Sequence, residues 1–239
     1  MDGLSGTHTS PADRRRPGPI VKAAVLVLAL ALLVFVGIRL YAWSEQAREA
    51  RGVVLVNSWN DVDHSGFTPK LRELGDGFRV DAACRKPLNE LLEACREAGF
   101  DPVLTAAYRS REEQQALFEQ TVEGLLGQYG GDRQAAEEAA ERAVARPGAS
   151  EHELGLAVDL ESRDGRSELM QQWLQENAWR YGFILRYPLG GEEITGEDYT
   201  PGHFRYVGMS AAGQIYALQI TLEEYMGMFF SESAQIIFE

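Results

Sequence analysis

The sequence predicts an α+β domain with a small mixed or antiparallel sheet and flanking helices, preceded by one apolar N-terminal helix. Short strand-like segments are interleaved with segments of helical period, too irregularly for a doubly wound sheet. No internal repeat is evident. Of the 239 residues, about 185 remain for folding once the N-terminal section is set aside, which favours one domain.

The N-terminal section predicts a membrane anchor. Residues 1–19 are rich in Ser, Pro, Gly and Arg, including the basic cluster 14–16, and are expected to form a disordered cytoplasmic tail. Residues 20–43 contain an apolar run close to the ~20 residues of a spanning helix, whereas the alternative, a cleaved signal peptide, has an apolar core of about 7–15 residues. The preceding basic cluster predicts a single-pass cell-membrane protein, with residues 44–51 as a stem and residues 52–239 as an extracytoplasmic domain.

The folded part begins with a short apolar run at 53–56 that fits a strand, followed by a polar loop. Apolar residues at spacings of three and four over 88–98 predict a helix that ends at Gly99. A strand is expected at 102–108. Ser110, with a glutamate three residues later, predicts the capped start of the next helix.

The second half continues this alternation. Residues 132–145 are rich in Ala, Glu and Arg and predict a peripheral helix. Alternating apolar residues at 156–160 predict a strand whose Asp159 points to the face opposite its neighbours. We expect a helix at 169–181, strands at 183–187 and 203–207, and a helix at 211–225.

The charge of the chain excludes one class of partner. The formal net charge is −13, with 36 acidic and 23 basic residues. A nucleic-acid partner requires a face rich in Lys and Arg, so none is expected. The acidity is typical of a solvated surface. The oligomeric state is not defined by any of these features.

The two cysteines are expected to be free, buried thiols. If one helix carries both Cys84 and Cys95, their Cα atoms lie about 16 Å apart, beyond the ~7 Å limit for a disulfide. Pro87 leaves an alternative, because proline suits the first turn of a helix and Cys84 could precede that helix in a loop. The predicted compartment is one in which disulfides persist.

Three side chains are candidate metal ligands. The segment S-E-H-E-L-G-L-A-V-D places His152 seven residues before Asp159, and His203 lies in P-G-H-F-R-Y-V-G. Zinc accepts imidazole and carboxylate ligands, and a catalytic site uses three protein ligands and leaves one position for water. Neither cysteine lies near these segments, so an open hydrolytic site is favoured over a closed structural one.

Two arginines are candidate partners for negative charge. Arg109 lies where a predicted strand ends and a helix begins, from which a guanidinium can reach a carboxylate or oxyanion. Its alternative role is a surface salt bridge with Glu112 or Glu113. Arg205 alternates with His203 on one face of a strand and is expected to order the site or bind substrate.

These segments together resemble the VanY-type D-alanyl-D-alanine carboxypeptidases, zinc peptidases related to the VanX dipeptidases. The resemblance is carried in order by A-Y-R-S-x-x-x-Q, S-x-H-x-x-G-x-A-x-D, G-F-I-L-R-Y-P, E-E-I-T-G and H-F-R-Y-V-G. It covers nearly all of residues 52–225. It implies a VanY/VanX-like fold.

The resemblance also implies a function. It assigns His152, Asp159 and His203 as ligands of zinc (Zn2+), and Arg109 as the cation for the substrate or transition state. Ser150 and Gln114 become substrate contacts. The expected reaction is removal of the terminal D-alanine from a peptidoglycan stem peptide that ends in D-Ala-D-Ala. An anchored, externally facing domain suits that substrate.

One departure from the family pattern concerns the general base. The last motif normally includes E-P-W-H, and its Glu takes a proton from water. Here Thr200 and Gly202 replace the Glu and the Trp. Threonine cannot accept that proton at neutral pH, and loss of a general base costs about 10²–10⁴ in rate. Gly202 is expected to leave a roomier, more flexible site.

A nearby carboxylate could substitute for the missing base. Glu197 is the first candidate, and Asp198, Glu151 and Glu153 are others. If none does, the chain is a weakened or inactive VanY-like peptidoglycan-binding protein. A third alternative is an extracytoplasmic scaffold whose histidines are structural.

Overall fold

The computed structural model describes residues 26–38 and 53–230. The predicted tail at 1–19 and stem at 44–51, and part of the predicted anchor at 20–43, lie outside these residues. Residues 26–38 form a helix with exposed side chains. In the described ranges, no helix has both the length and the apolar character that a membrane crossing requires. The N-terminal membrane helix is therefore not confirmed and stays a prediction.

The main sheet has four antiparallel strands in the order β3 (Pro102–Ala106), β4 (Ala157–Ser162), β6 (His203–Tyr206) and β5 (Phe183–Leu185). The predicted α+β class with a small antiparallel sheet is confirmed. The strands of 102–108, 156–160, 183–187 and 203–207 all form, within one or two residues of their expected starts.

A second, two-stranded sheet was not predicted. It pairs β1 (Leu71–Gly75) with β2 (Phe78–Asp81). The turn between them is the G-D-G segment, in which Asp76 has a φ of 51°. Gly, Asp and Asn dominate turns that need a positive φ, so G-D-G is the local signal for this hairpin.

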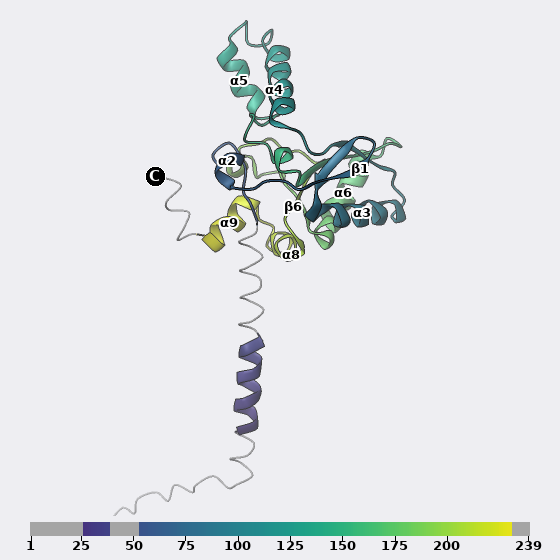
Figure 1. Ribbon diagram of the computed structural model, residues 1–239, viewed down its shortest axis with the longest axis vertical. Helices are drawn as coiled ribbons and strands as arrows, with labels where there is room; N and C mark the ends of the chain where they lie inside the picture. The colour runs from purple at the N-terminus through teal and green to yellow at the C-terminus, as the bar shows by residue number, and fades with distance from the viewer. Residues whose placement is uncertain (1–25, 39–52, 231–239) are drawn as a thin grey trace, which may run out of the picture. The chain divides into compact units, whose positions relative to one another are not determined.

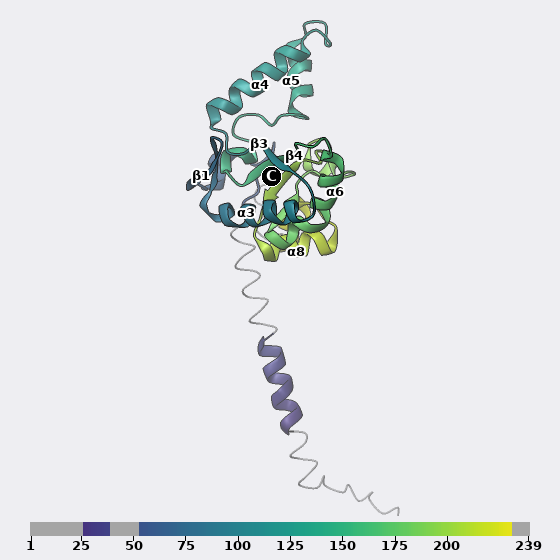
Figure 2. The same ribbon diagram turned by 90° about the vertical axis from the view of Figure 1, so that its right-hand side faces the viewer.

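The described helices of the folded domain are α2 (Val62–Ser65), α3 (Ala82–Glu97), α4 (Arg111–Leu125), α5 (Arg133–Glu141), η1 (Glu151–Leu154), α6 (Ser167–Asn177), η2 (Ala178–Tyr181), α7 (Glu192–Thr195), α8 (Met209–Leu218) and α9 (Leu222–Phe230). Helices α3, α6 and α8 each contact a strand of the main sheet, whereas α4 and α5 pack on each other and extend away from it (Figures 1 and 2). The predicted capping box of α4 is present, with the Ser110 side chain accepting from the Glu113 N–H.

Two expected elements differ from the structure. Residues 53–56 do not form a strand, because none of them pairs with a described strand. The Val54 carbonyl accepts a hydrogen bond from Arg205 Nη2 at 2.7 Å. The helix expected at 211–225 is divided into α8 and α9. Gln219, with a φ of 54°, has the left-handed conformation that ends α8.

The cysteines lie on one helix. Asp81 caps α3, so Cys84 is in its first turn and Pro87 is inside the helix, not at its start. The alternative in which Cys84 precedes the helix is therefore wrong. Cys84 and Cys95 are both free and fully buried in the core, as expected.

Gly155 is required where η1 turns into β4. Its φ is 66°, and a Cβ there would lie 2.9 Å from the backbone nitrogen of Asp81. Its carbonyl accepts a hydrogen bond from that same nitrogen at 2.8 Å. Gly165 has a similar φ of 79° but no atom within 4 Å of its Cβ position.

We therefore expect Gly155→Ala to destabilise the fold more than Gly165→Ala. The left-handed conformation costs each alanine about 1–2 kcal/mol, and the contact with Asp81 adds about 1–3 kcal/mol for Gly155→Ala alone. Urea unfolding of both variants measures the difference. Equal midpoints would show that the backbone around Gly155 adjusts freely.

The thiols should be unreactive in the folded protein. Burial raises the pKa of Cys84 to about 12 and that of Cys95 to about 11. The thiolate is the nucleophile and an unperturbed thiol has a pKa of about 8.5, so both thiols should react at pH 8 only after unfolding. Because the folded protein binds these protons more tightly, its stability should fall as the pH rises above about 8.5. Titration with a chromogenic disulfide, with and without denaturant, measures reactivity, and rapid labelling of the native protein would contradict the prediction.

Candidate metal centre

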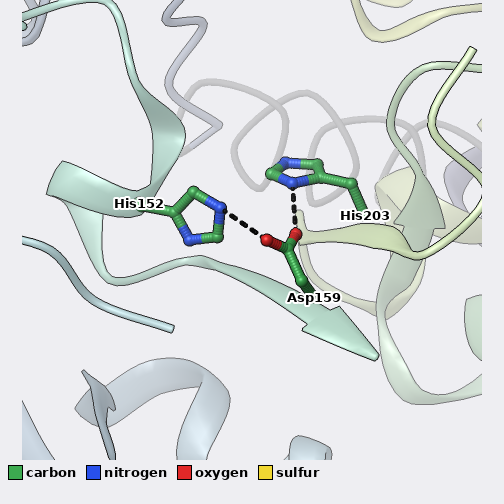
Figure 3. A group of neighbouring side chains, drawn as sticks. All are labelled: His152, Asp159 and His203. Carbon is green, nitrogen blue, oxygen red and sulfur yellow. Dashed lines mark hydrogen bonds and ion pairs between the residues drawn. The ribbon is translucent and has the colours of Figure 1, made fainter. Parts of the chain in front are cut away.

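The pairing of β4 with β6 brings two candidate ligands together. Asp159 and His203 are directly opposite in the antiparallel register. His152 comes from η1, which immediately precedes β4. The three side chains point toward one another from these separate elements (Figure 3). The structure thus brings together the three predicted ligands, and one ligand atom from each lies within 4.8 Å of the other two.

Hydrogen bonds define which nitrogen of each imidazole faces the centre. His152 Nδ1 lies 2.7 Å from the Ala107 carbonyl, which can only accept, so Nδ1 carries the proton and Nε2 has the free lone pair. His152 Nε2 lies 3.4 Å from Asp159 Oδ2. His203 faces the same carboxylate through Nδ1, at 2.8 Å from Asp159 Oδ1.

The electrostatics keep Asp159 ionised. Burial acts to raise its pKa, but the hydrogen bonds from His152 and His203 lower it well below the usual range. Burial lowers the pKa of His152. For His203, burial acts in the same direction, but Asp159 and Glu151 outweigh it and raise its pKa to about 9. The ionised Asp159 carboxylate therefore lies between the two imidazoles, in the place where a cation would fit.

The residues fit a zinc ion. Two imidazoles and one carboxylate are a ligand set of catalytic zinc sites, in which three protein ligands leave a position for water or substrate. The Ala107 carbonyl accepts a hydrogen bond from His152 Nδ1 and so orients the ring. Histidines that bind a metal commonly have such an acceptor at their other nitrogen. His152, Asp159 and His203 would hold the metal.

A cavity of about 370 Å³ opens onto these ligands. Its lining includes the candidate substrate residues Arg109, Gln114 and Ser150. No ion pair of Arg109 with Glu112 or Glu113 is found in the described structure, and its Nε is buried without a hydrogen-bond partner. The surface salt bridge considered for Arg109 is thus not observed, and Arg109 lines the cavity instead.

Gln114 and Ser150 form part of the wall. Gln114 is 1% exposed, donates from Nε2 to the Ala145 carbonyl at 2.6 Å, and keeps a buried Oε1 without a partner. Ser150 is 4% exposed and its side chain does not cap η1. Both polar groups therefore have hydrogen-bonding capacity left for a ligand.

The carboxylates near position 200 differ in where they point. Glu197 is 7% exposed and lines the cavity together with Thr200. Burial raises the pKa of Glu197 to about 7, although His203 and Arg186 partly offset it. Asp198 is exposed and pairs with Arg142 at 2.9 Å. Of the two loop carboxylates, only Glu197 lines the cavity.

The other two carboxylates are also accounted for. Glu153 accepts from the Gly148 N–H at 2.6 Å, pairs with Arg111 at 3.3 Å, and does not line the cavity. Glu151 reaches the cavity but is held by two arginines, Arg186 and Arg205, at 2.8 and 2.7 Å. Both of these carboxylates are paired with arginine, whereas no ion pair of Glu197 is found among the residues that the structure describes.

Arg205 points away from the cavity that holds the other candidate residues. Its side chain is 1% exposed, lies outside the cavity lining, and is directed to Glu151 and the Val54 carbonyl. Of the two roles predicted for Arg205, only ordering of the site is supported. Tyr187 was missed: it lines the cavity and stacks on the His203 ring with centroids 5.1 Å apart. Its position just after β5 in G-F-I-L-R-Y-P was the available signal.

Gly202 does not enlarge the cavity. A Cβ at this position would lie 3.1 Å from Gln171 Nε2 and 3.1 Å from the Leu160 carbonyl oxygen. Gln171 donates to that carbonyl at 3.3 Å and so occupies the space beside the glycine. The expectation of a roomier site is wrong, because position 202 faces α6 and the β4 backbone and not the cavity.

Comparison with known proteins agrees with this geometry. The model of the VanY family, D-alanyl-D-alanine carboxypeptidase, matches residues 77–209. The chain belongs to the VanY family. Over 177 residues it is 40% identical to a D-alanyl-D-alanine carboxypeptidase of Enterococcus faecalis, covering 73% of this chain and 65% of the relative. Over 146 residues it is 40% identical to the putative carboxypeptidase YodJ of Bacillus subtilis, covering 58% and 50%. The chain thus spans less than two thirds of either relative.

Two solved structures of VanY proteins are similar to this one. VanYB in complex with D-alanine-D-alanine superposes with a TM-score of 0.70 at 38% identity, covering 73% of this chain and 96% of that one. A vancomycin-resistance D,D-pentapeptidase VanY in complex with Zn(II) gives a TM-score of 0.68 at 40% identity, covering 72% and 97%. The predicted resemblance is confirmed.

Zinc should stabilise this VanY domain through the three ligands. At a zinc concentration a hundred times Kd, binding to the folded state adds about 2.7 kcal/mol to the free energy of unfolding. We expect zinc to raise the melting temperature of the metal-free protein, and that of an Asp198→Ala control, but not that of Asp159→Ala. An equal rise for Asp159→Ala would place the ion elsewhere.

Proposed function

We propose that this chain is a zinc D,D-carboxypeptidase that removes the terminal D-alanine from peptidoglycan stem peptides. The observation that carries the proposal is the convergence of His152, Asp159 and His203 on one wall of a cavity that also contains Arg109 and Glu197. Membership of the VanY family and the relatives named D-alanyl-D-alanine carboxypeptidase support it.

Zinc would act as the Lewis acid of the reaction. A bound zinc ion polarises a carbonyl group and lowers the pKa of water. The structure of a VanY protein with Zn(II), at 40% identity, supports the choice of this metal over other divalent ions. The ligand chemistry agrees, since imidazole together with carboxylate is a common zinc set.

Arg109 would select for a free carboxyl terminus. Its buried guanidinium Nε has no partner in the described structure, and the same cavity holds the Gln114 and Ser150 side chains. A guanidinium binds a carboxylate with paired, charge-assisted hydrogen bonds. The hydroxyl of Ser150 and the free Oε1 of Gln114 provide an acceptor and donor set for the peptide backbone. The VanYB complex with D-alanine-D-alanine supports such a ligand.

Glu197 would act as the general base in place of the missing family glutamate. It lines the cavity together with Thr200, and no ion pair of its carboxyl group with an arginine is found among the described residues. A carboxylate with a pKa near the working pH can take a proton from the attacking water and return it to the leaving amine. Burial in the cavity raises the pKa of Glu197 into this range.

A second candidate function is a peptidoglycan-binding protein with weak or no peptidase activity. The observation that favours it is Thr200 itself, whose hydroxyl donates to the Asp198 carbonyl at 2.9 Å where the family has a carboxylate. In this alternative the metal and the cavity remain, and Glu197 serves only to line the wall.

We further propose that the chain is anchored in the cell membrane by the apolar segment 20–43, with the peptidase domain outside the cell. The basic residues before this segment and the cell-wall substrate of the proposed reaction support this orientation.

The base assignment can be tested with zinc-loaded full-length protein and a pentapeptide ending in D-Ala-D-Ala. Glu197→Gln should reduce kcat for D-alanine release by about 10²–10⁴, because an amide cannot accept the proton. Asp198→Asn, the matched carboxylate of the same loop, should change kcat little. Undiminished turnover of Glu197→Gln would exclude this role.

Thr200→Glu separates the two functions. If release of D-alanine is detectable only in Thr200→Glu, the wild-type chain is the binding protein. If the wild type is active and Glu197→Gln is not, the chain is a peptidase with a relocated base. Peptide binding measured in parallel by calorimetry confirms that each variant keeps its cavity.

A further inference from the structure

Glu151 lies behind the metal centre in an unusual environment for a carboxylate. It is 1% exposed. Its Oε1 accepts from Arg186 Nε at 2.8 Å and pairs with Arg205 Nη1 at 2.7 Å. Its Oε2 lies 3.6 Å from His203 Nε2. Within the described structure, Oε2 and that nitrogen are both buried without a hydrogen-bond partner, so they have only each other.

The two nitrogens of His203 therefore face two different carboxylates. Nδ1 faces Asp159 at 2.8 Å and lies on the side of His152, whereas Nε2 faces Glu151. An imidazole binds a metal only through a nitrogen without a proton, and a carboxylate at the other nitrogen holds the proton there and orients the ring. In the metal-free structure both nitrogens thus face an acceptor. A cation bound between Nδ1 and Asp159 would take the place of the Nδ1 proton, and the carboxylate at Nε2 would hold the proton that remains.

We propose that Glu151 is a positioning residue for the metal centre: it keeps the proton of His203 on Nε2 and so directs Nδ1 to the ion. The inference rests on the proposed zinc function but concerns a residue outside the ligand set. Glu151 touches neither zinc nor substrate in this role and acts only through His203.

A buried network holds Glu151 in place. Arg186, fully buried, also forms a two-pronged ion pair with Glu223 of α9, at 2.9 and 2.5 Å. Glu223 in turn accepts from Asn57 Nδ2 at 3.1 Å. Arg205 is fixed by the Val54 carbonyl. Two arginines and two glutamates balance in charge, which a buried group of ions requires.

Because of this arrangement, Glu151→Gln should change the tautomer of His203 as well as remove a charge. The guanidinium groups of Arg186 and Arg205 only donate, so they will keep the amide oxygen of the new side chain. The amide NH2 then faces His203 Nε2. Because an NH2 donates, it favours the lone pair on Nε2 and the proton on Nδ1, which is the wrong tautomer for binding through Nδ1.

A purely structural role is the alternative, and Glu223 provides the control for it. Glu223→Gln removes a carboxylate of the same type from the same arginine, with more hydrogen bonds to Arg186 than Glu151 has. Glu223 does not contact His203. If the network only stabilises the fold, the two variants should affect zinc binding alike.

The experiment measures zinc affinity of the full-length chain by competition with a chromophoric chelator. We expect Glu151→Gln to bind zinc about 10–100-fold more weakly than the wild type, and Glu223→Gln to stay within about 3-fold of it. Melting temperatures of the metal-free proteins report the structural cost separately. An unchanged affinity of Glu151→Gln, or equal losses in both variants, would overturn the inference.

A second measurement needs no variant and so does not depend on Glu151→Gln folding. Long-range proton–nitrogen NMR spectra of the zinc-loaded wild type identify the protonated nitrogen of each of the four histidines. We expect His203 to carry its proton on Nε2, and a proton on Nδ1 would overturn the inference.

If the wild type binds no zinc, the proposed function fails, and the role of Glu151 with it. If the wild type and Glu151→Gln bind zinc equally tightly, the role of Glu151 is contradicted and the proposed function is not.

Discussion

The antiparallel pairing of β4 with β6 is the constraint on which the metal centre depends. It sets Asp159 opposite His203 and delivers both side chains to one point. Gly155, at the turn from η1 into β4, packs against the Asp81 backbone, where no Cβ would fit. His152 comes from η1, just before this turn. Residues separated by some fifty positions thus converge through backbone hydrogen bonds, which hold them more rigidly than loops could.

Around this centre the protein uses charge in two ways. Inside the domain, Glu151, Arg186, Arg205 and Glu223 form a balanced group that links the ligand His203 to α9. Arg109 and Glu197 line the cavity, and no ion pair of either side chain is found among the described residues. In the proposed function, the paired ions position a ligand, and Arg109 and Glu197 serve substrate binding and proton transfer.

The base position shows how a family site can change without losing its cavity. Thr200 replaces the usual carboxylate, and Glu197, three residues earlier, enters the cavity from the same loop. Arg142 holds the intervening Asp198 outside. Gly202 does not face the cavity, and Gln171 occupies the space next to it. The departures from the family pattern are therefore not equivalent, since only one of them alters the chemistry of the cavity.

The sequence by itself determined the α+β class, most strands and helices, the candidate ligands His152, Asp159 and His203, and Arg109 as a cavity residue. These follow from local patterns: alternation in strands, helical spacing, a capping box, and the side-chain chemistry of the ligands. Only the tertiary structure decided the direction of Arg205, the stacking of Tyr187, the partners of Glu151 and the space beside Gly202. Each of these depends on which distant segment packs against the residue, and local sequence patterns do not record contacts between segments far apart in the chain.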